Sequence, residues 1–534
     1  VEDHGREKGN SISQKAGAMF SRLPAIALAS VLNFMVGIPF GASYFPTEFP
    51  LAGKEVLGLR MFTFSTVVAQ FVFTFESKLV DCTGLQMVEN VPFYLELARI
   101  VMEEQASRGA GGASDVGGAC STLFFLFGLS SVIVGSVFYL LGRLELGRVV
   151  YFFPAHVLMG CIGGIGAFIV VTCLEVSTDT TFSFTAEGFQ QCIVQNFHLL
   201  APVIVFELAL RFMSRFVKYP LLGPIYFCFI TPILYLTLWT LDISMERAEE
   251  AGYFFPRLSS SGSALGDPDL FDIFTMVNLG SISWTAVVRA CPTVLSLAVF
   301  SLFHVPINIP AFAISTHVEP DMNAELIAHG YSNALAGLFG GLQNYLCYSN
   351  SVIYSKSNGK GKASSLALVA VTIVIYIYGP MIASFVPRCM AGTLLLHVGI
   401  DLFLEGVVET YKDYDKLEYS GIWLITIVMV AFGMDAALVA GAVAALSTYA
   451  AQSMIYQDPI RGSMSGVRLR SSAWNRCPES RAILEGKNGR RRIFVVQLQG
   501  HIFFGNVTKM ADDIKRKLRE NFEAGDEPAV VILD

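Results

Sequence analysis

Stretches of about twenty residues with almost no charged side chain recur along this chain, and they constrain its fold more than any other feature. Residues 23–44 and 363–386 contain none. An α-helix rises about 1.5 Å per residue, so about 20 residues cross the hydrocarbon core of a bilayer. Only 15% of the residues are charged and 53% are hydrophobic, whereas about a quarter of a soluble domain is charged. The chain is therefore predicted to lie in a lipid bilayer.

Apolar runs between polar or Gly/Pro breaks predict an all-α polytopic membrane protein with about fourteen spans. An even number of spans places both termini on the same side of the membrane. The predicted spans are 23–45, 57–76, 86–104, 119–141, 150–174, 197–216, 220–241, 285–303, 325–342, 349–358, 364–386, 391–408, 420–432 and 435–456.

Basic residues gather in the loops on one predicted side of the membrane, the side that also holds the basic stretch 461–492. The opposite loops are acidic or neutral, and residues 175–210 contain no Lys or Arg. Because cytoplasmic loops are enriched in Lys and Arg, both termini are predicted to be cytoplasmic. The net charge of −7 argues against a nucleic-acid partner. The basic loop residues are Arg143, Arg148, Arg211, Arg215, Lys218, Lys356, Lys360, Lys362, Lys412 and Lys416.

Two segments, 78–104 and 343–362, are too polar for lipid-facing helices. Each falls at the third span of a set of seven, which favours a 7+7 inverted repeat whose broken helices meet near the middle of the membrane. Extended backbone at that depth must line a site or pair with its counterpart. A small solute is therefore predicted to bind between residues 82–87 and 348–351.

Four regions are predicted along the chain. Residues 1–22 form a cytoplasmic N-terminal segment, 23–456 the transmembrane transporter domain, 457–491 a basic linker and 492–534 the start of a small α/β domain. In that last region 492–504 and 528–534 have strand patterns, and 508–521 has helical periodicity. The chain lacks an initiating Met and a cleavable signal peptide, and it stops within the α/β domain, so we expect a fragment of a longer protein.

Residues 321–341, DMNAELIAHGYSNALAGLFGG, resemble the signature of the SulP (sulfate permease) family. Residues 495–506 and 530–534 are similar to the STAS domain that follows the membrane part of these transporters. Residues 304–310 and 343–351 resemble a divergent branch that includes fungal vacuolar-membrane members. The resemblance implies a fold like that of uracil permeases, with a core domain, a gate domain, elevator-like secondary active transport and a homodimer. The sequence has no nucleophile, base and orienting group at plausible spacing, so neither an enzyme nor a cofactor is expected.

The entries of the third and tenth spans supply the first candidate binding residues. A helix N-terminus offers free N–H groups and partial positive charge, so two facing N-termini can hold an anion. At the tenth span these residues could donate hydrogen bonds or act as N-caps, and at the third span Gly84 permits close backbone approach. The candidates are Thr83, Gly84 and Gln86 in the first half and Tyr348, Ser349, Asn350 and Ser351 in the second.

Several positions depart from the family pattern. Asn350 stands where members that carry divalent or halide anions usually have Arg, and Phe40 stands where many relatives have Gln. His304 and Asn308 occupy the eighth span, where typical members carry an acidic residue. His304 could exchange a proton near neutral pH or serve as a core imidazole, and Asn308 is expected at a helix break between two prolines. Glu89 could be a proton or cation site, or could stabilise a helix N-terminus.

Three functions remain open from the sequence. The first is secondary transport of a small anion such as sulfate. The missing Arg and the vacuolar resemblance favour a second, proton-coupled transport of an amino acid, such as a basic one, in a vacuole-like compartment rather than the plasma membrane. The third is a non-transporting membrane sensor or scaffold. The ten cysteines have no CxxC pair or neighbouring His, so they are interpreted as small apolar residues rather than metal ligands.

Overall fold

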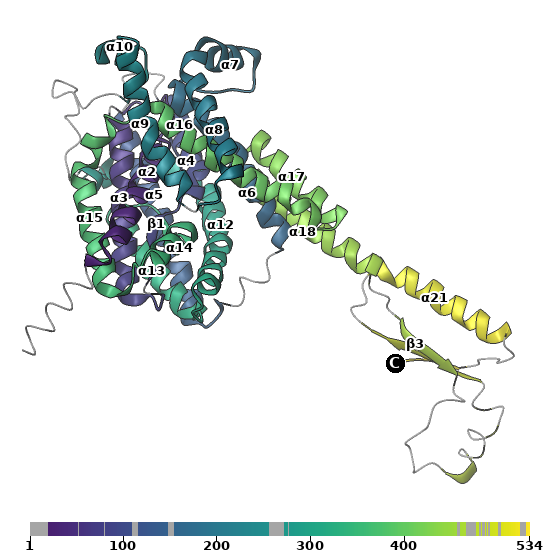
Figure 1. Cartoon of the computed structure of the whole chain (residues 1–534). Helices are drawn as coiled ribbons and strands as arrows, with labels where there is room; N and C mark the ends of the chain where they lie inside the picture. The colour runs from purple at the N-terminus through teal and green to yellow at the C-terminus, as the bar shows by residue number, and fades with distance from the viewer. Residues whose placement is uncertain are drawn as a thin grey trace, which may run out of the picture. The chain divides into compact units, whose positions relative to one another are not determined.

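Helices dominate the computed structural model (Figure 1). It divides into two compact units, residues 1–441 and 442–534. The predicted N-terminal segment up to residue 19, the loop residue Arg148 and most of the predicted linker lie outside the described residues. The structure describes residues 20–51, 53–79, 81–108, 116–147, 154–219, 221–255, 272–275, 277–456, 460–465, 477–479, 482, 486, 489, 492–499, 504–523 and 530–534.

Each of the fourteen predicted spans overlaps one helix of the structure. These helices are α2 (Leu23–Ala42), α3 (Lys54–Glu76), α4 (Val91–Arg108), α5 (Val116–Arg143), α6 (Ala155–Thr178), α8 (Phe197–Phe216), α9 (Leu222–Thr240), α12 (Trp284–Thr316), α13 (Met322–Leu338), α14 (Tyr348–Lys356), α15 (Gly361–Ala383), α16 (Arg388–Phe403), α17 (Lys416–Phe432) and α18 (Met434–Tyr456). Short helical segments between them are η1 (Val88–Asn90), α7 (Ala186–Phe189), η3 (Gln190–Gln195), α10 (Met245–Glu250), α11 (Asp272–Thr275), η4 (Leu279–Ser281), η5 (Leu404–Val408) and η6 (Glu409–Lys412).

Ten helices of the described part are long and apolar enough to cross a membrane. The remaining four helices from the predicted set are α4, α13, α14 and α17. Helices α13 and α17 have 17 residues each, and α14 has nine. Helix α4 has 18 residues but carries charged side chains throughout its second half. The chain is an integral membrane protein, and the count of fourteen spans stays a prediction.

Eight helices form one packed group, which we call the core group: α2, α3, α4, α5, α12, α13, α14 and α15. The most extensive contacts join α13 to α5 and α15 to α3, and further contacts join α12 to α4 and α14 to α2. A second set, the gate group, consists of α6, α8, α9, α16 and α17. In it α16 packs on α6 and α8, and α17 packs on α6. Helix α16 also contacts α2, which links the two groups.

Two three-residue strands lie within the core group. Strand β1 (Gly84–Gln86) comes directly before η1 and α4, and β2 (Asn344–Leu346) directly before α14. The strands pair antiparallel, with Gly84 opposite Leu346 and Gln86 opposite Asn344. The sequence prediction that the two interrupted segments converge is therefore confirmed, and strand pairing satisfies backbone groups that an interrupted helix leaves open.

The second unit contains a three-stranded sheet of order β3-β4-β5. Strand β4 (Ile493–Leu498) pairs in parallel with β5 (Val530–Leu533), and α21 (Phe504–Glu523) connects them. Both strands and the helix overlap the predicted ones, but β4 ends at Leu498 and α21 begins at Phe504, four residues before the predicted start. The assignment of all of 457–491 to a linker is wrong, because Ile460–Ser465 forms β3, antiparallel to β4. Its sequence, IRGSMS, has little strand character without that partner.

Candidate functional site

The strand pair brings two helix N-termini together from the two halves of the chain. Because β1 and β2 run antiparallel, the helices that follow them leave the pair in opposite directions. The Met87 amide donates to the Gln343 carbonyl at 2.8 Å, and the Cys347 amide donates to the Thr83 carbonyl at 3.2 Å. These bonds extend the ladder by one residue at each end. The helix starts are thus fixed relative to each other by backbone bonds.

Side chains at the candidate positions reinforce this pairing. The Thr83 amide donates to Ser351 Oγ at 2.9 Å, and the Thr83 and Ser351 hydroxyl oxygens lie 3.2 Å apart. Gln86 donates to the Met87 carbonyl at 2.8 Å and accepts from the Tyr44 hydroxyl at 2.7 Å. All of these side chains are buried. In this conformation Thr83 and Ser351 hold the two half-helices together, and Gln86 ties the end of β1 to Tyr44.

The backbone of Gly84 lies very close to other atoms, as the sequence predicts, but these atoms belong to the neighbouring helix α3. A Cβ at this position would lie 2.6 Å from the Ala69 Cβ and 2.8 Å from the Gln70 amide nitrogen. The Gly84 amide donates to Gln70 Oε1 at 2.8 Å. The missing side chain therefore lets β1 lie directly on α3.

Each strand has one amide side chain that binds its backbone. Gln70 on α3 accepts from the Gly84 amide and donates to the Cys82 carbonyl at 3.2 Å. Asn333 on α13 accepts from the Asn344 amide and donates to the Asn344 carbonyl, both at 2.9 Å. A carboxamide carries both a donor and an acceptor, so it can replace a missing strand neighbour. Gln70 and Asn333 thus close the outer edges of the pair.

His329 fixes the end of β2 from α13. Its Nδ1 lies 2.7 Å from the Glu325 carbonyl oxygen and its Nε2 lies 3.1 Å from the Leu346 amide nitrogen. The carbonyl can only accept and the amide can only donate, so the imidazole is neutral with its proton on Nδ1. The ring is fully buried and packs 4.6 Å from the Phe73 ring.

We predict that His329→Leu lowers the thermal stability of the purified protein. Leucine leaves the buried Leu346 amide without an acceptor, which costs about 1–3 kcal/mol. The unfolding midpoint in detergent measures the effect. His198→Leu provides the control, because His198 is exposed on α8. Equal midpoints for the two variants would contradict this role of His329.

Signature residues of α13 also hold the loop that precedes β1. Asp321 caps the helix by accepting from the Ala324 amide at 3.2 Å. Glu325 accepts from the Ser77 hydroxyl and from the Lys78 amide, both at 2.8 Å. The signature therefore serves as a frame: it positions the segment between α3 and β1.

A buried carboxylate lies at the start of η1. Glu89 Oε1 accepts from the Tyr345 hydroxyl at 2.9 Å, and His304 Nε2 lies 3.4 Å from the same oxygen. Glu89 Oε2 is buried and has no hydrogen-bond partner among the described residues. The Phe300 ring stacks on the His304 ring with centroids 5.5 Å apart. Helices from both halves of the chain thus build one acidic position between β2 and α12.

A second carboxylate approaches this position from the gate group. Glu405 lies in η5, a π-helical turn that continues α16, and it interacts electrostatically with His304 and Glu89. Glu405 itself is exposed. Gly406, the next residue, lies against Gly163 of α6, where an added Cβ would be 2.4 Å from the Gly163 nitrogen. π-helical turns occur frequently at functional sites.

The first turn of α14 has no side-chain cap. Its N-cap residue, Cys347, makes no capping hydrogen bond. Asn350 is buried and donates to Asn33 Oδ1 on α2 at 2.9 Å, and Ser349 is exposed. Tyr348 reaches α12, where its hydroxyl lies 3.0 Å from Ser315 Oγ. This terminus therefore carries its partial positive charge beside the exposed Ser349 side chain.

Phe40 and Asn308, the other two predicted contact positions, lie on α2 and α12. Phe40 is fully buried within α2. The helix break predicted around Asn308 is wrong, because α12 runs unbroken through Pro306 and Pro310. The Asn308 amide donates at 3.3 Å to the carbonyl of His304 on its own helix. Long apolar helices tolerate proline when neighbouring groups satisfy the freed backbone.

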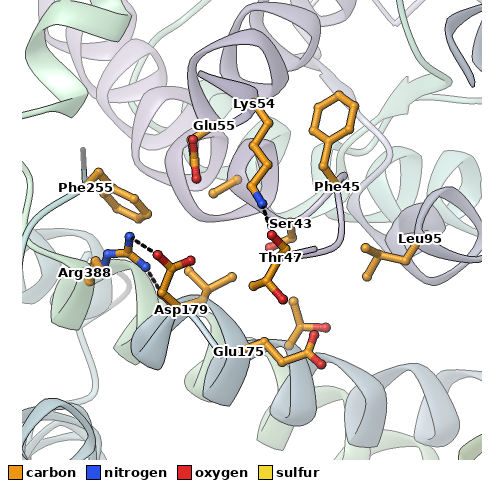
Figure 2. Close-up of a pocket in the computed structure, with 13 residues that line it drawn as sticks. Ser43, Phe45, Thr47, Lys54, Glu55, Leu95, Glu175, Asp179, Phe255 and Arg388 are labelled. Atoms are coloured by element: carbon orange, nitrogen blue, oxygen red, sulfur yellow. Dashed lines mark hydrogen bonds and ion pairs between the residues drawn. The ribbon is translucent and has the colours of Figure 1, made fainter. Parts of the chain in front are cut away.

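A small cavity of about 30 Å³ lies between the core and gate groups near the start of α3 (Figure 2). Lys54 donates to the carbonyls of Pro46 and Thr47 at 3.0 and 2.5 Å. On the gate side Arg388 pairs with Asp179 at 3.0 Å. The space is enough for only one or a few water molecules. The two groups are thus nearly closed against each other at this end.

A larger cavity of about 400 Å³ lies near the other end of α3. Three lysines line it, Lys78, Lys356 and Lys360, together with Asp81. Lys78 also forms an ion pair with Asp321 at 2.5 Å. That hydrogen bond lowers the pKa of the Asp321 carboxyl below its usual value, so this carboxyl stays ionised near neutral pH.

The apolar helices and the paired half-helices define a polytopic membrane protein. The model of the Sulfate permease family matches residues 28–426. The chain belongs to this family, so the resemblance found in the sequence is confirmed.

One relative is the "Vacuolar basic amino acid transporter VSB1" of Saccharomyces cerevisiae, 32% identical over 505 residues. The match covers 93% of this chain and 47% of that protein. The chain therefore spans about half the length of this curated relative.

Two solved structures share the fold. The transmembrane domain of a cyanobacterium bicarbonate transporter, BicA, matches with a TM-score of 0.57 and 16% identity, covering 79% of this chain and 97% of that one. The murine Solute Carrier 26 family member A9 anion transporter matches with a TM-score of 0.65 and 14% identity, covering 96% and 80%.

Proposed function

We propose that this protein is a secondary transporter of cationic amino acids. The observation that carries the proposal is the buried Glu89 carboxylate, whose Oε2 has no hydrogen-bond partner among the described residues. An unpartnered buried carboxylate is costly unless a cation or a proton meets it. A guanidinium or ammonium group would supply both positive charge and hydrogen-bond donors. An inorganic anion would be repelled.

The other end of such a substrate also has a partner. The uncapped first turn of α14 offers backbone N–H groups, which suit an α-carboxylate. The place that holds Arg in many anion-carrying members holds Asn350, whose amide is bonded to Asn33. A fixed positive charge that would repel a cationic side chain is thus replaced by a neutral group. The name of the yeast relative supports the same substrate class.

Transport of a small anion is the second candidate. The three lysines of the 400 Å³ cavity favour it, because a basic vestibule attracts anions. This was the first function that the sequence suggested, with sulfate as the example. Anion transport would require the anion to pass close to the negatively charged Glu89 carboxylate. For this reason we place it second.

Packing supports a mechanism based on an inverted repeat. If spans one to seven are exchanged with spans eight to fourteen, the contact α5–α13 becomes α15–α3, and α12–α4 becomes α2–α14. Both members of each pair occur. Gln70 and Asn333, which bind the two strands, lie on α3 and α13, and these helices also exchange. We propose that the core group moves against the gate group, with the narrow end in Figure 2 closed and the lysine-lined end open.

The location and assembly follow as further proposals. The relative's name favours a vacuole-like membrane. The basic loops favour cytoplasmic termini. The β3-β4-β5 sheet with α21 fits the start of a STAS domain, and the family resemblance favours a homodimer.

Uptake into proteoliposomes tests the proposed function. Labelled arginine, lysine and sulfate are compared, with and without a pH gradient. We expect saturable arginine and lysine uptake that the gradient changes, and no sulfate uptake. Sulfate uptake without arginine uptake would establish the anion transporter instead. No flux of any of the three would favour the sensor or scaffold.

We predict that Asn350→Arg lowers arginine uptake about tenfold or more. A fixed charge roughly 10 Å from a cationic substrate, at an effective dielectric of about 20, costs about 1.7 kcal/mol, which corresponds to a factor of about 16. Initial uptake rates measure the change. Asn350→Gln is the matched neutral variant and should retain more uptake than Asn350→Arg. Equal rates for both variants would contradict the assigned polarity of the site.

A further inference from the structure

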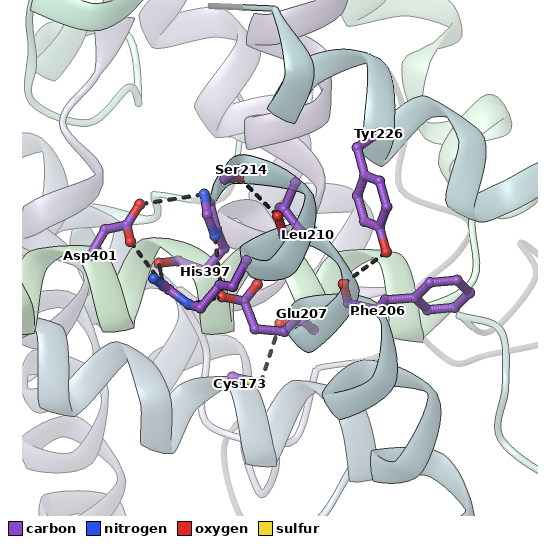
Figure 3. A network of polar contacts seen from close by, with 10 residues as sticks. Cys173, Phe206, Glu207, Leu210, Ser214, Tyr226, His397 and Asp401 are labelled. Carbon is purple, nitrogen blue, oxygen red and sulfur yellow. Dashed lines mark hydrogen bonds and ion pairs between the residues drawn. The ribbon is translucent and has the colours of Figure 1, made fainter. Parts of the chain in front are cut away.

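Four ionisable side chains form a closed ring inside the gate group, away from the strand pair (Figure 3). Glu207 and Arg211 come from α8, and His397 and Asp401 from α16. Arg211 Nε lies 2.5 Å from Glu207 Oε1, and its Nη2 lies 2.8 Å from Asp401 Oδ1. His397 Nδ1 lies 3.2 Å from Glu207 Oε1, and its Nε2 lies 3.3 Å from Asp401 Oδ2. Arginine and histidine therefore both bridge the same two carboxylates.

The two contacts of His397 can both be hydrogen bonds only if the ring of four side chains holds one proton more than it does with a neutral imidazole and two ionised carboxylates. Both ring nitrogens of His397 face carboxylate oxygens, and an ionised carboxylate can only accept. A neutral imidazole has a single N–H, so one of its nitrogens would direct a lone pair at a carboxylate. An added proton, on the imidazole or on a carboxyl, turns both contacts into hydrogen bonds. It also balances the charge, because Arg211 alone offsets only one of the two carboxylates.

Burial separates the two ends of the ring. The Glu207 side chain is 3% exposed, and its Oε2 has no hydrogen-bond partner among the described residues. The Asp401 side chain is 52% exposed. His397 lies between them, so a proton arriving at Asp401 can pass through the imidazole to the buried carboxylate. The unpartnered Glu207 oxygen is a second, independent sign of a vacant proton position.

The surroundings contain few other ionisable groups. Cys173 on α6 and Tyr226 on α9 interact electrostatically with Glu207, and the Tyr226 hydroxyl donates to the Phe206 carbonyl at 2.8 Å. Glu405 in η5 interacts with Asp401. Helix α2, which also packs on α16, carries no ionisable side chain. The ring centroids of Phe227 on α9 and His397 lie 5.8 Å apart.

We infer that Glu207, Arg211, His397 and Asp401 form a proton-binding site that joins α8 to α16 within the gate group. Binding a proton strengthens the bonds between these two helices, and losing it weakens them. Helix α16 continues into η5, which carries Glu405 near the Glu89 position. A change in how tightly α16 is bonded to α8 therefore also affects the position of Glu405. The inference does not depend on which solute the protein carries.

Thermal unfolding of the purified full chain in detergent tests the site without a substrate. If the folded protein binds one proton more than the unfolded chain near neutral pH, the stability falls as the pH rises. We expect the unfolding midpoint of the wild type to fall by roughly 3 °C between about pH 5.5 and about pH 8. Glu207→Gln should remove most of this fall, because it removes one of the two carboxylate charges, and Arg211 then balances Asp401 without an added proton.

Two further variants make the test specific. His397→Gln removes the titrating ring and should also flatten the pH profile. His198→Gln changes an exposed histidine on the same helix α8 and should keep the wild-type profile. A wild-type midpoint that does not fall, or a fall retained in both Glu207→Gln and His397→Gln, would overturn the inference, as would loss of the fall in His198→Gln. If arginine uptake is absent but these profiles hold, the proposed function fails and the proton-binding site stands.

Discussion

Glu89→Gln lowers the initial rate of arginine uptake about 100-fold, the largest functional effect that we expect from a single substitution. Removing one partner of a buried charge pair costs about 2–5 kcal/mol, and about 2.7 kcal/mol corresponds to a factor of about 100. Glutamine keeps the shape of the side chain and can still accept from the Tyr345 hydroxyl, which lies 2.9 Å from Glu89 Oε1. The substitution therefore removes the charge and leaves the local structure in place.

The matched control for this experiment is Glu96→Gln on α4. Its side chain is 40% exposed and lies 3.9 Å from Arg99. We expect uptake close to that of the wild type, and a single size-exclusion peak for both variants. Glu89→Asp should restore part of the rate because it restores the charge. A rate for Glu89→Gln within about threefold of the wild type would exclude Glu89 from the substrate site.

The sequence was sufficient to locate the helices and the meeting of the two halves. The length of the uncharged runs defines each helix, and polar residues at 78–104 and 343–362 showed where helices are interrupted. These are local signals, because a bilayer excludes charge and unpaired backbone at every position. Strand β3 had no such signal, since its residues become a strand only by pairing with β4.

The chemical partners of the candidate residues could not be predicted. Glu89 and His304 are more than two hundred residues apart in the sequence, and their 3.4 Å contact depends on the packing of α12 against α4. Thr83 and Ser351 were predicted as ligand contacts, and in the structure they are hydrogen-bonded to each other. Glu405 was missed because it lies at the end of an apolar helix that looked continuous. The helix changes there to the π-helical turn η5, and no residue pattern in the sequence indicates this change.

Among substitutions of glycine by alanine, we expect Gly58→Ala to disrupt folding most. A Cβ on Gly58 would lie 1.9 Å from the carbonyl oxygen of Gly41 on α2, which is backbone and cannot move aside without shifting the helix. Overpacking of this kind costs about 1–3 kcal/mol or more. Helix α2 carries Asn33, the partner of Asn350, so the strain also reaches the first turn of α14. We expect loss of most of the monodisperse size-exclusion peak, or a midpoint lowered by roughly 5–10 °C.

Gly223→Ala tests whether the crowding at Gly58, rather than the loss of a glycine, causes the defect. Gly223 also lies in the first turns of a helix, α9, but an added Cβ would meet only the Phe227 ring at 4.0 Å. Alanine favours a helix over glycine by about 1 kcal/mol, so this variant should be as stable as the wild type or more stable. Because α2 approaches α3 through Gly41 and Gly58 at van der Waals distance, the position of Asn33 depends on two residues that have no side chain. If Gly58→Ala unfolds at the same temperature as Gly223→Ala, that close approach does not exist in the folded protein.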